Sequence, residues 1–219
     1  MLEKPLLNEE FSYRRRLIEE ITQLEWEMFS TVSNVGGLAA CQKSNGTFEV
    51  MRKAQHNIWS NDTLESYKTD LMSAAENHLN LMTCKYGYMM AKTFPREYEE
   101  IKDQLPNISE EKRELVMTLT LQHNAWTKES AKRYPRMCAY GRPLDDAAAG
   151  DSSWPSVENY FFCELLTYSC DTLRLCLRDF EVNTQRGDNP ALQILKGIAF
   201  HHGYERLEDL EEALLIQQR

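Results

Sequence analysis

The sequence predicts an all-α protein, a single-domain bundle of about seven or eight helices over residues 1–219. Three observations predict it. Apolar residues recur at intervals of three and four, turn residues separate these stretches, and no strand alternation or internal repeat stands out. With 219 residues, 42% of them hydrophobic, the chain is long enough for one sizeable core, so a second domain is not required.

Helix signals in the first half of the chain are separated by glycines and capping residues. Paired glycines close the first helix, whose apolar residues lie on one face. Thr47 and Asn61 are suitable N-caps, and Pro95 suits a first helical turn. We therefore expect helices over residues 9–32, 47–59, 61–94 and 95–105, the third with a possible break near Asn80.

The second half continues this pattern around one irregular segment. Ser109 is an N-cap followed by two glutamates, and Asn189 with Pro190 forms a cap and a first turn. Residues 135–155 lack an apolar period and are rich in Gly, Pro, Ser and Asp, so they are either a domain boundary or a functional loop. We expect helices over residues 109–134, 156–184, 189–203 and 207–219.

Charge and composition exclude several classes of protein. Lys plus Arg is 25 against Asp plus Glu 34, and a net charge of -9 repels phosphate backbones, so we expect no nucleic acid partner. No apolar run approaches the ~20 residues that span a bilayer, and the segment "MLEKPLLNEEF" lacks the basic-then-apolar pattern of a secretory signal. We expect a cytoplasmic protein without a membrane partner. The six cysteines lack zinc-site spacing, which predicts free thiols and no metal site, and missing cofactor motifs leave any cofactor unknown.

Two glutamates fall on apolar helix faces. Glu25 lies on the stripe of the first helix, and Glu164 lies beside Tyr168 on a later one. A buried carboxylate requires a cation, a metal or a proton held by a raised pKa. Arg52 is the natural counter-ion, and Gln55 lies near it on the same helix face. The alternative is that both glutamates lie at the edge of their stripes and reach water.

Inward carboxylates also raise the question of catalysis. Di-iron bundles require Glu-x-x-His, and no histidine in the chain has a glutamate three residues before it. Glu25 and Glu164 remain candidate catalytic acids or bases. Cys41 follows the glycine turn, with His56 as the nearest possible base, and is a candidate nucleophile, although a small packed residue is the simpler interpretation.

These residues define a candidate pocket between helices. We predict that the segment "GGLAACQ" closes the first helix over a polar pocket where Glu25, Arg52, Gln55 and Glu164 converge. Arg142, beside a rigid turn, is a candidate clamp for a carboxylate or a phosphate, and Trp59 is most simply a core or near-core residue. The candidate ligand-binding residues are Glu25, Asn34, Gln42, Arg52, Gln55, Trp59, Arg142, Glu164 and Tyr168.

An ordered series of segments carries a family resemblance. The segments are "LEWEMF", "NVGGLAACQ", "FEVMRKAQHNIW", "SYKTDL", "KYGYMM", "IKDQLP", "KRYP", "GRP" and "ELLTYSCDTL". Together they resemble the bacterial domain of unknown function 4125 family, from about Ile18 to about Leu177. The resemblance implies no activity. Some relatives are joined to, or encoded near, a nucleotidyltransferase-like domain, which implies an accessory role.

The chain departs from the family pattern at two places. Leu38 stands where relatives usually have a basic residue, and "ENHLNL" stands where they more often have Gly-Arg-Asn. If the basic residue binds an anion in relatives, this protein has lost or altered that ligand.

Three functions remain open at this point. The first is binding of a small polar metabolite or nucleotide in an inter-helical pocket, with or without chemistry. The second is an interaction module without a ligand, pairing as a homodimer or with a nucleotidyltransferase-like partner. The third is a carboxylate metalloenzyme, which the missing histidine spacing disfavours.

Overall fold

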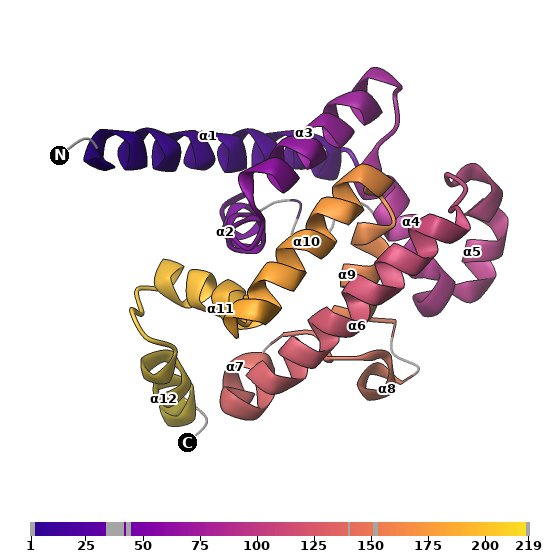
Figure 1. Ribbon diagram of the computed structural model, residues 1–219. Coiled ribbons are helices and arrows are strands. Elements are labelled where there is room, and N and C mark those ends of the chain that lie inside the picture. The colour runs from indigo at the N-terminus through magenta and orange to yellow at the C-terminus, as the bar shows by residue number, and fades with distance from the viewer. Residues whose placement is uncertain (1–2, 34–41, 43–44, 140, 151–152, 218–219) are drawn as a thin grey trace.

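The computed structural model describes residues 3–33, 42, 45–139, 141–150 and 153–217. These residues form twelve α-helices, a short 3-10 helix (η2) and no strand, which confirms the all-α prediction (Figure 1). The helices are α1 (Glu3–Ser30), α2 (Asn45–His56), α3 (Asn61–Glu76), α4 (Leu81–Thr93), α5 (Pro95–Ile101), η2 (Lys102–Gln104), α6 (Glu110–Arg133), α7 (Pro135–Ala139), α8 (Asp146–Ala149), α9 (Val157–Leu165), α10 (Cys170–Arg186), α11 (Pro190–His201) and α12 (Leu207–Gln217).

The described helices outnumber the predicted ones because capping side chains begin new helices inside two predicted elements. The predicted helix over residues 156–184 is in fact α9 and α10, and the Ser169 hydroxyl accepts the Thr172 N–H to begin α10. Asn80 caps α4 in the same way, so the break near this residue is real. Residues 135–155, which we expected to lack helix, contain the short helices α7 and α8.

One main core spans both halves of the chain. Ile21, Leu64, Leu119 and Leu173 are completely buried in it and come from α1, α3, α6 and α10. A smaller apolar cluster lies where α12 contacts α7 and α11. The continuous main core is the arrangement expected of a single domain.

Helices α3 and α10 cap each other. The Asp179 carboxylate on α10 accepts the N–H of the serine that caps α3, at 2.8 Å, and the hydroxyl of the threonine three residues later, at 2.6 Å. The Asp70 carboxylate on α3 accepts the same two groups at the start of α10, at 2.9 and 2.7 Å. The corresponding residues are Ser60 and Ser169, Thr63 and Thr172, and Asp70 and Asp179.

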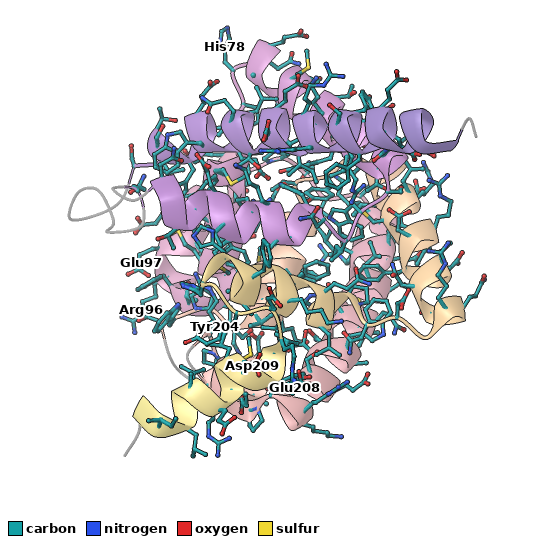
Figure 2. The ribbon with its side chains drawn as sticks, turned by 90° about the vertical axis from the view of Figure 1, so that its left-hand side faces the viewer. His78, Arg96, Glu97, Tyr204, Glu208 and Asp209 are labelled. Atoms are coloured by element: carbon teal, nitrogen blue, oxygen red, sulfur yellow. The ribbon has the colours of Figure 1, made fainter. Side chains whose placement is uncertain are left out.

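The ends of these two helices also correspond. His78 after α3 and Gly187 after α10 have positive φ angles of 56° and 71°. In both turns the next residue's N–H bonds back to the carbonyl five residues earlier, the pattern of a Schellman motif. His78 therefore carries a side chain where the left-handed backbone favours glycine. Figure 2 shows it at the outer edge of the molecule.

Helices α1 and α6 make matching bonds to their neighbours. Asn80 and Asn189, the caps of α4 and α11, donate side-chain bonds to carbonyls of α1 and α6, at 2.8 and 3.2 Å. Arg14 on α1 and Lys112 on α6 donate to carbonyls just after α2 and α9, at 3.0 and 3.3 Å. Each half of the chain thus repeats the same connections.

These correspondences define two units. The first unit is α1, α2, α3 and α4, and the second unit is α6, α9, α10 and α11. Contacts between the units are reciprocal, because α2 packs on α11 as α9 packs on α4, while α3 packs on α10. Such reciprocity is typical of an approximate two-fold relation. Our prediction that the chain contains no internal repeat is therefore wrong.

Candidate functional site

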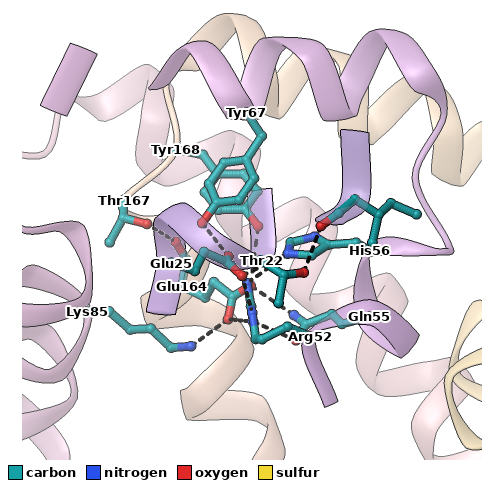
Figure 3. A network of polar contacts seen from close by, with 11 residues as sticks. Thr22, Glu25, Arg52, Gln55, His56, Tyr67, Lys85, Glu164, Thr167 and Tyr168 are labelled. Atoms are coloured by element: carbon teal, nitrogen blue, oxygen red, sulfur yellow. Dashed lines mark hydrogen bonds and ion pairs between the residues drawn. The ribbon is translucent and has the colours of Figure 1, made fainter. Parts of the chain in front are cut away.

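A group of buried polar side chains lies where the first unit meets α9. Figure 3 shows them pointing toward one another. We call this group the ionic cluster, and it consists of Glu25, Arg52, Gln55, His56, Tyr67, Lys85, Glu164 and Tyr168. Its four ionised side chains are at most 3% exposed. Removing one such charge from water costs several kcal/mol unless it is paired, so the pairing decides whether the fold tolerates the cluster.

Arg52 lies at the centre of the ionic cluster and binds both carboxylates. Its Nε donates to Glu25 Oε2 at 2.7 Å, and its Nη2 donates to the other Glu25 oxygen. Its Nη1 donates to the two Glu164 oxygens at 3.0 and 2.9 Å and to Gln55 Oε1 at 2.8 Å. The planar guanidinium suits this position because its donors form a fixed fork. The prediction of Arg52 as counter-ion is confirmed.

Glu25 is bound by further side chains from α2 and α3. The Tyr67 hydroxyl donates to Glu25 Oε1 at 2.8 Å, and His56 Nε2 lies 2.9 Å from Glu25 Oε2. The other ring nitrogen of His56, Nδ1, is buried and has no hydrogen-bond partner among the described residues. Thus α1 carries Glu25, and α2 and α3 carry its direct partners.

Glu164, on α9, is bound by side chains from both units. Lys85 Nζ on α4 donates to Glu164 Oε2 at 2.5 Å, and Gln55 Nε2 on α2 donates to Oε1 at 2.9 Å. The Tyr168 hydroxyl, in the turn before α10, donates to Oε1 at 3.2 Å. Gln55 and Glu164 occupy corresponding positions in the two units, so their hydrogen bond joins equivalent positions of the two units.

The surrounding cations keep both carboxylates ionised. Burial raises the pKa of the Glu25 carboxyl most strongly, but the charges of Arg52 and His56 and their hydrogen bonds together outweigh burial and hold this pKa well below its usual range. Arg52 and Lys85 together overcome the effect of burial on Glu164 and lower its pKa to about 2. Such carboxylates are weak bases and hold no proton to donate at neutral pH. The ionisation therefore favours binding over acid–base catalysis.

Two rings and an arginine lie between the ionic cluster and the surface. Lys85 Nζ is 3.6 Å from the centroid of the Tyr160 ring, and Arg142 Cζ is 4.8 Å from the same centroid. Arg142 Cζ is also 5.7 Å from the ring centroid of Trp154, which is 57% exposed. The segment that carries Arg142 and Trp154 therefore lies against the ionic cluster through Tyr160.

The second unit has less polar side chains where the first unit has the ionic cluster. His123 on α6 stacks on Phe161 of α9, with ring centroids 3.9 Å apart, where Glu25 on α1 binds Arg52 on α2. Burial lowers the pKa of His123 to about 4, so this ring is neutral at pH 7. At three further positions the first unit has a polar side chain and the second has an apolar residue or a cysteine. These pairs are His56 and Leu165, Tyr67 and Cys176, and Lys85 and Ile194.

The structure brings together five of the predicted site residues in the ionic cluster. They are Glu25, Arg52, Gln55, Glu164 and Tyr168. Both glutamates are buried, at 0% and 1% exposure, so the alternative in which they reach water is wrong. The predicted convergence of charges is confirmed, and its role in binding stays a prediction.

The other predicted site residues lie elsewhere. Gln42 donates to two carbonyls at the end of α1, at 3.0 and 2.8 Å, and so holds that helix end. Trp59 is 3% exposed and stacks on Phe180 in the core. Arg142 lies at the edge described above. Asn34, Leu38 and Cys41 lie outside the described residues.

Sequence reasoning missed three members of the ionic cluster. The sequence indicates His56 only as a possible base for Cys41, and Tyr67 follows the apolar period of its helix, which gives no signal of a polar role. Lys85 had a usable signal, because it lies between Met82 and Met89 at spacings of three and four on the buried face of α4. A lysine on such a face requires a buried anion, and Glu164 is that anion.

Two other site classes can be tested on the described part of the chain. No three of its His, Cys, Asp and Glu side chains gather in a way that could hold a metal ion. None of its helices is long and apolar enough to cross a membrane.

Comparison with known proteins identifies a family. The family described as "Protein of unknown function (DUF4125)" matches residues 15–212. No curated protein and no solved structure matches the chain. The whole ionic cluster lies within the matched region.

Proposed function

Because the chain belongs to the DUF4125 family, whose description states no activity, we propose a function from the ionic cluster itself: the protein binds a small polar metabolite or nucleotide between the first unit and α9. The contrast between the two units is the observation that supports this proposal. The second unit packs the same helix arrangement with Phe161 and Leu165 at positions where the first unit has Arg52 and His56. The arrangement therefore does not require buried charges.

The energetics of buried ion pairs strengthen this argument. Removing the charges from water costs about as much as their attraction returns, so apolar residues at such positions are often equally stable. A cluster that stability does not demand calls for another explanation. Convergent donors and acceptors whose pKa values are strongly perturbed are typical of binding sites.

The chemistry of the cluster favours a ligand with a carboxylate or phosphate group. Arg52 and Lys85 are donors suited to these acceptors, and Arg142 lies nearby, against the same Tyr160 ring as Lys85. Gln55 is only half-buried, whereas the other members of the ionic cluster are buried, so the cluster comes closest to solvent at this side chain. A ligand oxygen entering there would replace Glu164 on Lys85 or on Arg52.

A thermal-shift screen against sugar phosphates, nucleotides, amino acids and divalent metals tests the proposal. Any compound that raises the Tm of the wild-type protein is then tested on Arg52→Lys, which keeps the positive charge and loses the fork of donors. Glu100→Gln, a change at an exposed glutamate of α5, is the matched control. We expect a sugar phosphate or nucleotide to stabilise the wild type and the control, but not Arg52→Lys. A screen without any stabilising compound, or a shift that survives in Arg52→Lys, would contradict the proposal.

The alternative is an interaction module that needs no ligand, beside the nucleotidyltransferase-like partner that the family resemblance implies. The exposed Leu121 and Met117 of α6 favour it. The metalloenzyme reading lacks comparable support, because Arg52 occupies the space between the two carboxylates where a shared metal ion would bind.

A further inference from the structure

We propose that the outer face of α6 binds a second copy of this chain as an antiparallel helix pair. Five exposed residues at spacings of three and four share this face: Glu114, Met117, Leu121, Ala125 and Lys128. Leu121 is 67% exposed and Met117 is 51% exposed. Neighbouring apolar side chains at the middle of a long surface helix are typical of a face that a partner covers.

The first unit provides an internal comparison for this face. Helix α1 holds the place in the first unit that α6 holds in the second, and its corresponding residues Glu19, Gln23 and Glu27 are polar and exposed. The packing of the unit therefore does not demand apolar residues on the outer face. The apolar residues of α6 need an explanation outside the chain's own fold.

The order of residues along α6 fits a second copy in particular. Met117 and Ala125 lie equally far on either side of Leu121, and so do Glu114 and Lys128. In an antiparallel pair centred on Leu121, each Glu114 therefore meets the Lys128 of the other copy. Each large Met117 side chain likewise meets a small Ala125. A face that is complementary to itself in this way is the requirement for a two-fold dimer.

Two features define the strength of this dimer. Lys128 already pairs with Asp145 at 2.7 Å, but its side chain remains 54% exposed and can share or exchange that partner. The apolar part of the face is short, so the interface belongs to the small, transient class. We expect a dimer that forms at high protein concentration. No residue of the ionic cluster is on α6, so this proposal and ligand binding fail or succeed separately.

Sedimentation velocity of the full chain over a range of concentrations tests the dimer. We expect the wild type to dimerise and Leu121→Glu to dissociate at least about tenfold more readily, because two carboxylates then meet at the two-fold axis. Gln23→Glu, at the corresponding position of α1, should leave the dimer unchanged. Far-UV circular dichroism checks that both variants are folded. A wild type that stays monomeric, or a dimer that Leu121→Glu does not weaken, would overturn the proposal.

Charge exchange identifies the pairing within the dimer. Glu114→Lys and Lys128→Glu should each weaken self-association, because like charges then face each other. An equimolar mixture of these two variants should restore dimers, since each new lysine meets a new glutamate in the mixed pair. A mixture that behaves like either variant alone would exclude the antiparallel register.

Discussion

Acidification should reveal how much the ionised Glu164 contributes to stability. Its pKa is about 2 in the folded protein against an ordinary value of 4.5. A tenfold change in proton affinity corresponds to ~1.4 kcal/mol, so the ionised form contributes on the order of 3 kcal/mol. Because the folded-state pKa is lowered, this contribution is fully present above pH 4.5 and is lost as the pH falls toward 2. Glu164→Gln, which cannot ionise, lacks it at every pH.

Urea unfolding at a series of pH values measures this contribution. The free energy of unfolding of the wild type should exceed that of Glu164→Gln most at pH 7, and the difference should shrink by roughly 3 kcal/mol as the pH approaches 2. Glu100→Gln, at an exposed position, should follow the wild type throughout. A difference between wild type and Glu164→Gln that is constant with pH would refute the assignment of Glu164 as an ionised partner of Arg52 and Lys85.

Three further predictions concern stability at pH 7, measured by urea or thermal unfolding. Arg52→Met should cost ~3–5 kcal/mol because it leaves two buried carboxylates short of a cation, and a cost below ~1 kcal/mol would contradict the described pairing. His78→Gly should gain ~1 kcal/mol because glycine relieves the left-handed backbone, while Gly187→Ala at the corresponding turn should lose stability; a loss for His78→Gly would show that its side chain matters more than its φ angle. Asp70→Asn and Asp179→Asn should each cost ~1–3 kcal/mol through the lost caps, and a cost confined to one of them would contradict the equivalence of the two units.

The sequence predicted the helical class and the centre of the ionic cluster because both depend on local spacing. Apolar period and caps are visible within one helix, and a glutamate on an apolar stripe, such as Glu25, demands a buried cation wherever it lies. Arg52 could be matched to it because few inward-facing cations were available. The same local argument applies to Lys85, whose place between Met82 and Met89 on the buried face of α4 also demands a buried partner of opposite charge.

The internal repeat escaped detection for a different physical reason. The two units share their helix caps and the hydrogen bonds around them, and only a few residues determine these. They are the serine and threonine at the start of α3 and of α10, and the aspartate of the opposite helix that binds them. Packing positions are free to differ, as Arg52 and Phe161 show. The segment between α6 and α9 is also longer than that between α1 and α2, so no constant spacing aligns the two units. Within "ENHLNL", His78 stands at the position where the second unit has Gly187, and both residues have a positive φ angle.

The reciprocal caps of α3 and α10 also bear on how such a chain could have originated. Asp70 adds to the serine cap of a helix in the second unit and Asp179 adds to the serine cap of a helix in the first, so each helix start is completed from the other unit. Two identical half-length chains carrying this serine, threonine and aspartate would satisfy each other's caps across a symmetric interface. The two halves of the present chain keep these caps while their interiors differ, with the Glu25–Arg52 ion pair in the first and the stacked His123 and Phe161 rings at the corresponding place in the second.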